Sequence, residues 1–469
     1  MMPNILIFAV VPLRYDFISC YGYPRPTTPH IDSLAAAGVV FEKAYSTAVW
    51  TPPAHASLVT GLQVSNHQVT ENSGALDSSI PTLPGLLSGK GYHSVGFITT
   101  PMMGSYKSLE RGFQVFYWQR HDWRWLPASL RKRASYRLGG FQLGLFDKGA
   151  SAIIKAALNW LSDKRRDPFF MLIGLDEPHS PYNPPWLLRK RYLQKLSYEF
   201  PKALDHTFLT QLNRNPYMVP ARLVQPEEMY FEALRTLYAA EVAYTDALIG
   251  RVLDFLRNSK LLESTVVVFL GEHGESIGEN GLMAHEGSLY ETLVHIPLII
   301  RFPGASPAGL RVPGLVQLID VMPTLLEIAG VDTRNLALDG MSLLPVLSAA
   351  SRRDCVVAEW EGFVPGGLQK LMARSPQPIP TQVYTRKLQM IRCRDHKFIQ
   401  SSLGDDELFD LAVDPGEQKN LGQERPEIVA ELRARLAKLL SQRVKEPVDK
   451  SEELKASVLR DLRDSGYKI

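Results

Sequence analysis

Residues 265–270 constrain the fold of this chain more than any other segment. They form a short run of β-branched and large apolar residues without polar alternation, which is typical of buried strands in parallel sheets. Similar strand candidates alternate with helical patterns along the chain, at residues 5–10, 39–44, 93–98, 169–175 and 297–301. This alternation predicts an α/β fold with a mainly parallel sheet that helices cover on both faces.

The chain is long enough for a large core and for more than one structural unit. It has 469 residues, of which 45% are hydrophobic, and this size favours two units. From about residue 347 the pattern changes to shorter strand candidates (356–359, 388–393, 397–399) and a helix at 427–440. We therefore predict a core domain over 1–346, a C-terminal α+β subdomain over 347–444 and a charged tail over 445–469.

Composition argues against several classes of protein. Charged residues make up 22% of the chain and the net charge is only +3, so we expect no nucleic-acid partner. Three irregularly spaced cysteines (Cys20, Cys355 and Cys393) predict no disulfide framework. The apolar run 5–11 lacks the basic start and cleavage site of a signal peptide, and no run reaches transmembrane length. We expect a cytoplasmic protein.

Two segments carry candidate site residues. The 265–270 strand runs directly into Gly271-Glu272-His273-Gly274-Glu275. A carboxylate and an imidazole at the C-terminal end of a strand have metal-ligand chemistry, and they lie where open α/β sheets bind ligands. Thr51 precedes Pro52 and Pro53 at the start of a short helical pattern. Thr51 is either only an N-cap or a group placed at the positive helix end to meet an anionic ester.

Taken together with further motifs, these segments resemble the sulfatase family of the alkaline phosphatase superfamily over nearly the whole chain. In chain order the matching motifs are Pro3-Asn4-Ile5-Leu6-Ile7, Leu13-Arg14-Tyr15-Asp16, Cys20-Tyr21-Gly22-Tyr23, Thr28-Pro29-His30-Ile31-Asp32, Pro178-His179-Ser180-Pro181-Tyr182, Leu298-Ile299-Ile300-Arg301-Phe302-Pro303-Gly304, Asp320-Val321-Met322-Pro323-Thr324 and Leu408-Phe409-Asp410-Leu411. The resemblance implies an alkaline-phosphatase-like α/β sandwich with a smaller C-terminal subdomain, an antiparallel sheet with one helix.

The resemblance also implies catalytic residues, with one departure. Sulfatases carry a Cys or Ser that is oxidised to formylglycine in a Cys/Ser-x-Pro-x-Arg motif, whereas this chain has Thr51 at the first place and His55 at the last. Threonine cannot become formylglycine, but its hydroxyl can attack directly once a metal or base activates it. Thr51 is then the candidate nucleophile, and His55, His179 and His285 are candidates for binding the oxyanion or moving protons.

A second departure concerns the metal site that the family implies. The family places one or two metal-binding aspartates directly after the first strand, where this chain has Val11 and Pro12, and an aspartate where it has Glu272. The remaining candidate metal ligands are Glu272 and His273, with Thr51 as a third donor. Calcium, magnesium, manganese or zinc are the candidate ions, but hard cations want more oxygen donors than this set supplies.

Two interpretations of function follow. In the first, the protein is a pseudoenzyme on a sulfatase fold that binds a ligand or partner without turnover, since a fold does not guarantee chemistry. In the second, it is a metal-dependent hydrolase of a sulfate ester, phosphate ester or phosphodiester, with Thr51 as the nucleophile. A small anionic ester is the candidate substrate or ligand.

Two insertions, near 119–148 and 185–225, distinguish this chain from a minimal sulfatase-like core. Basic and aromatic residues interleave over 120–141, which is consistent with a lid over an anionic substrate or a contact with a protein or membrane surface. The alternative that we favour is a solvated insertion whose arginines extend along the surface. The charged tail 445–469 is a second candidate docking segment.

Overall fold

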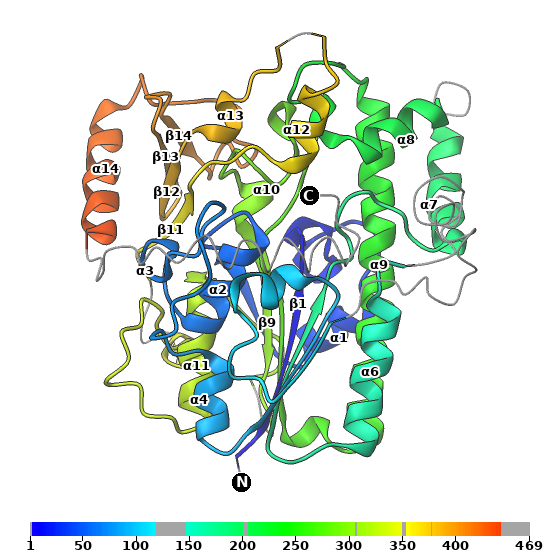
Figure 1. Ribbon diagram of the computed structural model, residues 1–469, viewed down its shortest axis with the longest axis vertical. Coiled ribbons are helices and arrows are strands. Elements are labelled where there is room, and N and C mark those ends of the chain that lie inside the picture. The colour runs from blue at the N-terminus through cyan, green and yellow to red at the C-terminus, as the bar shows by residue number, and fades with distance from the viewer. Residues whose placement is uncertain are drawn as a thin grey trace.

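The core of the protein is a mainly parallel sheet (Figure 1). The structure, a computed structural model, describes residues 2–118, 147–199, 205–304, 307–348, 353–376 and 378–441. The strands of this sheet are β1 (Asn4–Val10), β2 (Val39–Tyr45), β3 (His93–Ile98), β4 (Val115–Trp118), β5 (Phe169–Leu175), β6 (Thr265–Gly271), β9 (His295–Arg301) and β10 (Leu310–Gln317). Their order is β10-β2-β9-β6-β1-β5-β3-β4, and all neighbours are parallel except the two pairs that β9 makes.

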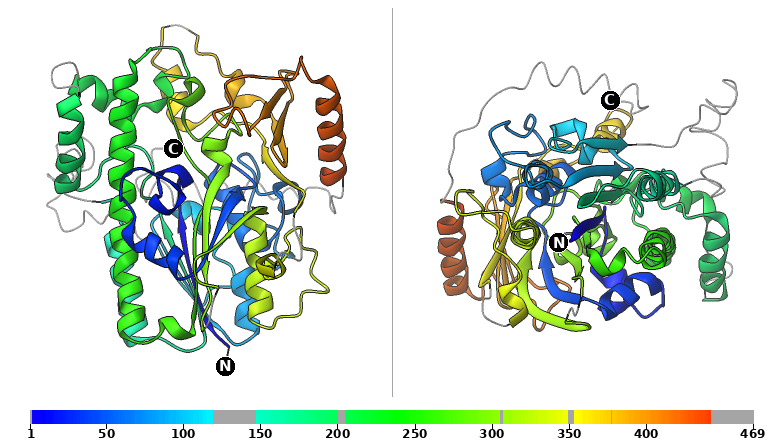
Figure 2. Two further views of the ribbon diagram at one scale, coloured as in Figure 1. Left: turned by 180° about the vertical axis from the view of Figure 1, so that it is seen from behind. Right: turned by 90° about the horizontal axis from the view of Figure 1, so that it is seen from below.

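Helices cover both faces of the sheet because its central strands are apolar on both sides. Alternate residues of β1 belong to two different hydrophobic clusters, one on each face. On one face pack α1 (Pro29–Ala36), α6 (Ala150–Asp163) and α9 (Glu228–Asn258); on the other pack α2 (Thr51–Thr60), α4 (Leu83–Gly89) and α11 (Val321–Ile328). Figure 2 shows these layers from two further directions. The predicted α/β sandwich is confirmed.

The remaining α-helices are short or peripheral. Two of them, α7 (Trp186–Glu199) and α8 (His206–Arg214), lie beside α9 at the edge of the molecule (Figure 1). The others are α3 (Val64–His67), α10 (Glu291–Val294), α12 (Gly366–Met372) and α13 (Gln382–Thr385). A two-stranded hairpin of β7 (Ser276–Ile277) and β8 (Met283–Ala284) follows the central strand β6.

A smaller antiparallel sheet forms the C-terminal part of the described chain. It consists of β11 (Cys355–Trp360), β12 (Leu388–Cys393), β13 (His396–Ser401) and β14 (Glu407–Asp410), in that order. One face is covered by α14 (Pro426–Leu440) through Leu432, Leu436 and Leu440. The other face packs on residues near α10 of the main domain. This is the antiparallel sheet with one helix that the family resemblance implied.

Buried charges join the small sheet to the large one. Lys397 Nζ of β13 lies 3.0 Å from Glu291 Oε1 and 2.8 Å from Glu417 Oε1. Arg392 of β12 donates to Glu291 Oε2 at 2.9 Å. Burial raises the pKa of Glu417 to about 7, although Lys397 opposes this. Because buried carboxylates need cationic partners, these four residues, the Glu291 network, make docking of the small sheet depend on charge pairing.

Two of the three cysteines form a disulfide that their spacing did not predict. Cys355 and Cys393 lie directly opposite each other on β11 and β12, with their Cα atoms 4.3 Å apart, and are bonded. Spacing alone could not indicate this pair, because the pairing depends on strand register. Disulfides persist mainly in oxidising compartments and are rare in the cytoplasm. The bond is therefore unusual for the cytoplasmic location that we expected.

We expect the purified protein to show a single reactive thiol, that of Cys20, when it is denatured without reductant. The disulfide closes a loop of 38 residues, so reduction is expected to lower the free energy of unfolding by about 3–4 kcal/mol in the chain-entropy model. Cys20→Ser serves as the control and should leave this loss unchanged. Three reactive thiols in protein isolated under thiol-blocking conditions would contradict the bond and fit a reducing compartment.

Several expectations differ from the structure or stay predictions. Strands β4, β10 and β14 were not predicted; in β10 the register shifts between Val312 and Leu315, around Pro313 and Gly314. The domain boundary at 346/347 stays a prediction. Most of the insertion at 119–148 and all of the tail 445–469 lie outside the described residues. No α-helix that the structure describes combines the length and apolar character needed to cross a membrane, and the cytoplasmic location stays a prediction.

Candidate functional site

Four of the predicted site residues come together at the carboxyl edge of the main sheet. Strands β6, β1 and β5 are neighbours there; His273 follows β6, His179 follows β5, and Thr51 begins α2 beside them. Thr51 Oγ1 lies 3.2 Å from His273 Nε2. The His285 ring centroid lies 4.7 Å from that of His273 and 5.1 Å from that of His179. We call these four residues the Thr51 site.

Thr51 is not the helix cap that its sequence context suggested. Trp50 occupies the N-cap position of α2 without a capping hydrogen bond from its side chain, and Thr51 is the first helical residue. The following prolines remove two backbone N–H donors from the first turn. The Thr51 hydroxyl is nearly buried and contacts His273 instead. Its placement therefore favours a role in the site over helix capping.

The contacts of His273 fix which nitrogen faces Thr51. Nδ1 lies 3.0 Å from the carbonyl oxygen of Gly274; a carbonyl only accepts, so Nδ1 carries the proton. In the neutral ring Nε2 is then an acceptor, and the Thr51 hydroxyl donates to it. Complete burial, and next the charge of His285, lower the pKa of His273 well below its usual value. The pair thus has the hydroxyl–imidazole arrangement of an activated nucleophile.

His285 sits between two buried carboxylates. Its Nδ1 lies 3.1 Å from Glu275 Oε1, and its Nε2 lies 3.8 Å from Glu286 Oε1. Burial opposes its charge, but Glu286 and Glu275 raise the pKa of His285 to about 9. Tyr217 donates to Glu286 Oε1 at 2.9 Å and holds that carboxylate in place. His285 is therefore a protonated imidazole whose charge is already offset by its neighbours.

His55, also predicted as a site residue, has a different partner. Its Nδ1 lies 2.6 Å from Glu272 Oε1, and both side chains are completely buried. A carboxylate accepts, so His55 Nδ1 carries the proton. The second nitrogen of His55 and the second oxygen of Glu272 have no hydrogen-bond partner among the described residues. His55 and Glu272 thus contact each other through one atom each.

The donors present do not fit a zinc or calcium ion. After β1 stand Val11, which is part of an apolar cluster, and Pro12, neither with a side-chain oxygen. Glu272 is engaged by His55, and His273 by Thr51. In the part of the chain that the structure describes, no three His, Cys, Asp or Glu residues are arranged to hold a metal. Zinc takes three or four protein ligands and calcium six to eight oxygens, so this set falls short.

Sequence reasoning assigned no role to the partners of His285. Glu275 and Glu286 fix its charge, and Tyr217 fixes Glu286. The two glutamates stand in the same short segments as His273 and His285. This short spacing is a pattern in the sequence that indicates acid–base pairs. Tyr217 comes from the region of the second insertion, and no pattern in the sequence connects it to the site.

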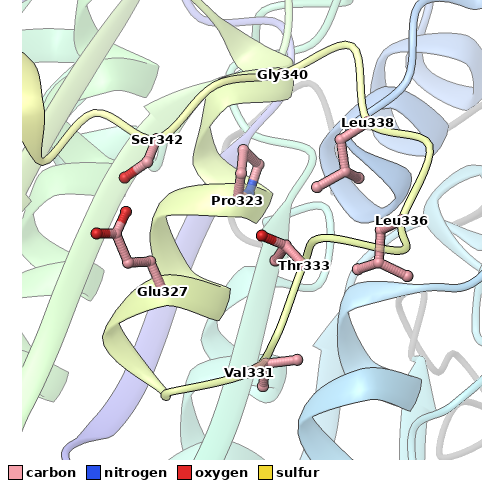
Figure 3. Close-up of a pocket in the computed structure, with 8 residues that line it drawn as sticks. All are labelled: Pro323, Glu327, Val331, Thr333, Leu336, Leu338, Gly340 and Ser342. Atoms are coloured by element: carbon pink, nitrogen blue, oxygen red, sulfur yellow. The ribbon is translucent and has the colours of Figure 1, made fainter.

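A surface cavity of about 330 Å³ lies elsewhere, between α11 and the segment that follows it (Figure 3). Its lining is formed by Pro323, Glu327, Val331, Thr333, Leu336, Leu338, Gly340 and Ser342. It contains none of the predicted site residues and only one ionisable group, Glu327. Because it lacks paired acid and base groups, we do not assign chemistry to it.

Comparison with known proteins identifies the family. The family model described as Sulfatase matches residues 3–331. A sulfatase of Formosa agariphila is 25% identical over 446 residues, covering 89% of this chain and 82% of the relative; arylsulfatase K of Rattus norvegicus is 27% identical over 437 residues, covering 88% and 73%. The crystal structure of the phosphonate monoester hydrolase of Agrobacterium radiobacter shares the fold, with a TM-score of 0.73 at 22% identity, covering 94% of this chain and 96% of that one. With its fold, motifs and family model in agreement, the chain belongs to the sulfatase family.

Proposed function

We propose that the Thr51 site binds the anionic group of a sulfate or phosphate ester without metal-dependent turnover, as a pseudoenzyme on a sulfatase fold. The observation that carries this proposal is the convergence of Thr51, His273 and His285 at the carboxyl edge of the sheet, without the carboxylates after β1. The Thr51 hydroxyl is a suitable hydrogen-bond donor for a sulfate or phosphate oxygen when it turns away from His273 Nε2, and the protonated His285 lies beside it. Half-buried His179 gives the site its contact with solvent.

The charge balance of the site favours binding over turnover. Transfer of a phosphoryl or sulfuryl group needs positive charge where the transition state becomes negative. The protonated ring of His285 lies 4.7 Å from that of His273, between centroids, but Glu275 and Glu286 offset its charge. Loss of a single oxyanion donor costs other enzymes about 10²–10³-fold in rate. A site with Val11 and Pro12 in place of metal-binding carboxylates, and with two carboxylates beside its imidazolium, is expected to lose more.

The second candidate function is hydrolysis with Thr51 as the nucleophile. The observation that favours it is the 3.2 Å contact between Thr51 Oγ1 and His273 Nε2. His273 would take the proton of the attacking hydroxyl, because its acceptor nitrogen faces Thr51. The sulfatases and phosphonate hydrolases among the similar proteins make hydrolysis the chemistry to test.

Binding and turnover separate the two candidates. We expect inorganic phosphate or sulfate to bind the wild-type protein in isothermal titration calorimetry in the presence of EDTA. Thr51→Val should weaken this binding about 2- to 10-fold, the worth of one hydrogen bond. We expect no turnover of 4-nitrophenyl phosphate, bis(4-nitrophenyl) phosphate or 4-nitrophenyl sulfate, with or without added Mn²⁺ or Zn²⁺.

Thr333→Val is the matched control, because Thr333 lines the cavity of Figure 3 and lies outside the Thr51 site. It should leave anion binding unchanged. Turnover that Thr51→Val abolishes and Thr333→Val preserves would replace the pseudoenzyme with the hydrolase. Absence of both anion binding and turnover would contradict both candidates.

A further inference from the structure

We infer that His55 takes the place of a divalent cation as the partner of Glu272, so that the Thr51 site is assembled without metal. The family resemblance places an arginine where His55 stands and a metal-binding aspartate where Glu272 stands. In this chain the two replacements contact each other across 217 positions of sequence. His55 is therefore a positioning residue that acts through Glu272.

The geometry of the pair supports the substitution. His55 Nδ1 and Glu272 Oε1 are 2.6 Å apart, and neither side chain is exposed. A carboxylate at full burial is unfavourable unless a cation or N–H group compensates it. His55 lies one turn into α2, on the same short helix that begins with Thr51. The pair thus links α2 to the residue that follows β6.

The surrounding donors are also paired within the protein. Thr51 and His273 contact each other, and Glu275 is held by His285. At the end of β1, the carbonyl oxygen of Pro12 accepts from the Tyr238 hydroxyl at 3.2 Å. These contacts join the groups in separate pairs, whereas the ligands of a cation surround a common point. Glu272 Oε2, Glu275 Oε2 and His55 Nε2 have no hydrogen-bond partner among the described residues, and the experiments below test whether a metal binds at these atoms.

The inference rests on the same site as the proposed function, but different results would contradict the two. A protein that binds phosphate only with a metal would overturn the inference and leave anion binding in place. A metal-free protein that binds no anion would contradict the proposed function and leave the inference in place.

The first experiment uses the wild-type protein. Metal content is measured by plasma mass spectrometry after purification without chelator, and Tm is measured with EDTA and with added Mn²⁺, Zn²⁺, Ca²⁺ or Mg²⁺. We expect substoichiometric metal and an unchanged Tm in every case. Stoichiometric metal, or a fall in Tm on chelation that the metal reverses, would overturn the inference.

The second experiment tests the pair itself with His55→Ala, Glu272→Ala and the double variant. Because each single variant leaves one buried group unpaired, we expect the Tm losses to be non-additive, with the double variant losing less than the sum. Additive losses would contradict the pairing. We also expect His55→Ala to bind Mn²⁺ more tightly than the wild type in calorimetry, and the double variant to lose this gain.

His67→Gln is the control for removal of a buried imidazole. His67 is also almost fully buried, but its partner is the Ser57 hydroxyl, 2.9 Å from its Nε2, rather than a carboxylate. This variant should show no gain in Mn²⁺ affinity. A gain there equal to that of His55→Ala, or no gain in His55→Ala, would count against His55 as the replacement for a cation. If His55→Ala does not fold, the wild-type measurements still decide.

Discussion

Replacement of Lys397 by methionine is expected to lower the free energy of unfolding by about 3–5 kcal/mol, the usual result of removing one partner from a buried ion pair. The Lys397 ammonium lies 3.0 Å from Glu291 and 2.8 Å from Glu417, and its side chain is completely buried. Methionine fills a similar volume, so the loss would come from charge rather than from a cavity. Urea unfolding followed by circular dichroism measures it.

Lys387→Met is the matched control in the same subdomain. Lys387 pairs with Glu361, but 64% of its side chain is exposed, and exposed pairs contribute about 0–1 kcal/mol. Adding Glu417→Gln to Lys397→Met should recover part of the loss, because it removes a carboxylate that methionine leaves unpaired. A Lys397→Met variant as stable as Lys387→Met would show that the Glu291 network does not hold the small sheet in place.

Much of the fold could be predicted because burial leaves a direct mark on the sequence. The six predicted core strands all form, since continuous apolar runs indicate strands covered on both faces. The missed strands lack that mark: β4 has only four residues, and β10 contains Pro313 and Gly314, which weaken a strand pattern. The disulfide was missed for a related reason, because Cys355 and Cys393 meet only once the register of β11 and β12 is set.

The sequence could predict that Thr51, His179, His273 and His285 lie near one another, but it could not predict how they pair, and their role as a functional site stays a prediction. Residues at the carboxyl ends of neighbouring parallel strands must share one edge of the sheet, which brings His179 and His273 near Thr51. Which side chain contacts which depends on rotamers and on partners far away in sequence. The pairing of His55 with Glu272 rather than with a ligand is of this kind. The contact of the Thr51 hydroxyl could not be predicted for the same reason. This hydroxyl contacts the His273 imidazole instead of capping its own helix.

Replacement of Gly274 by alanine is expected to disrupt both stability and the Thr51 site. A Cβ atom at this position would lie 2.0 Å from the carbonyl oxygen of Thr292 and 3.0 Å from its carbonyl carbon. The contact is with backbone, so no side chain can move aside to relieve it. Overpacking usually costs about 1–3 kcal/mol, and with a rigid neighbour we expect about 3 kcal/mol or more in urea unfolding.

Gly274→Ala should also weaken anion binding. We expect this loss of affinity to be larger than the loss that a smaller fraction of folded protein would cause. The Gly274 carbonyl accepts from His273 Nδ1, and its N–H donates to the carbonyl of Leu293 at 2.7 Å. Moving this backbone away from α10 therefore shifts the imidazole that faces Thr51. Gly366→Ala is the control, because outside its chain neighbours and the backbone of its own helix no described atom lies within 4 Å of the place that its Cβ would take. This variant should change stability by about 1 kcal/mol or less. A Gly274→Ala variant that binds phosphate as the wild type does, in conditions where it is fully folded, would show that the position of His273 does not govern recognition of the anion.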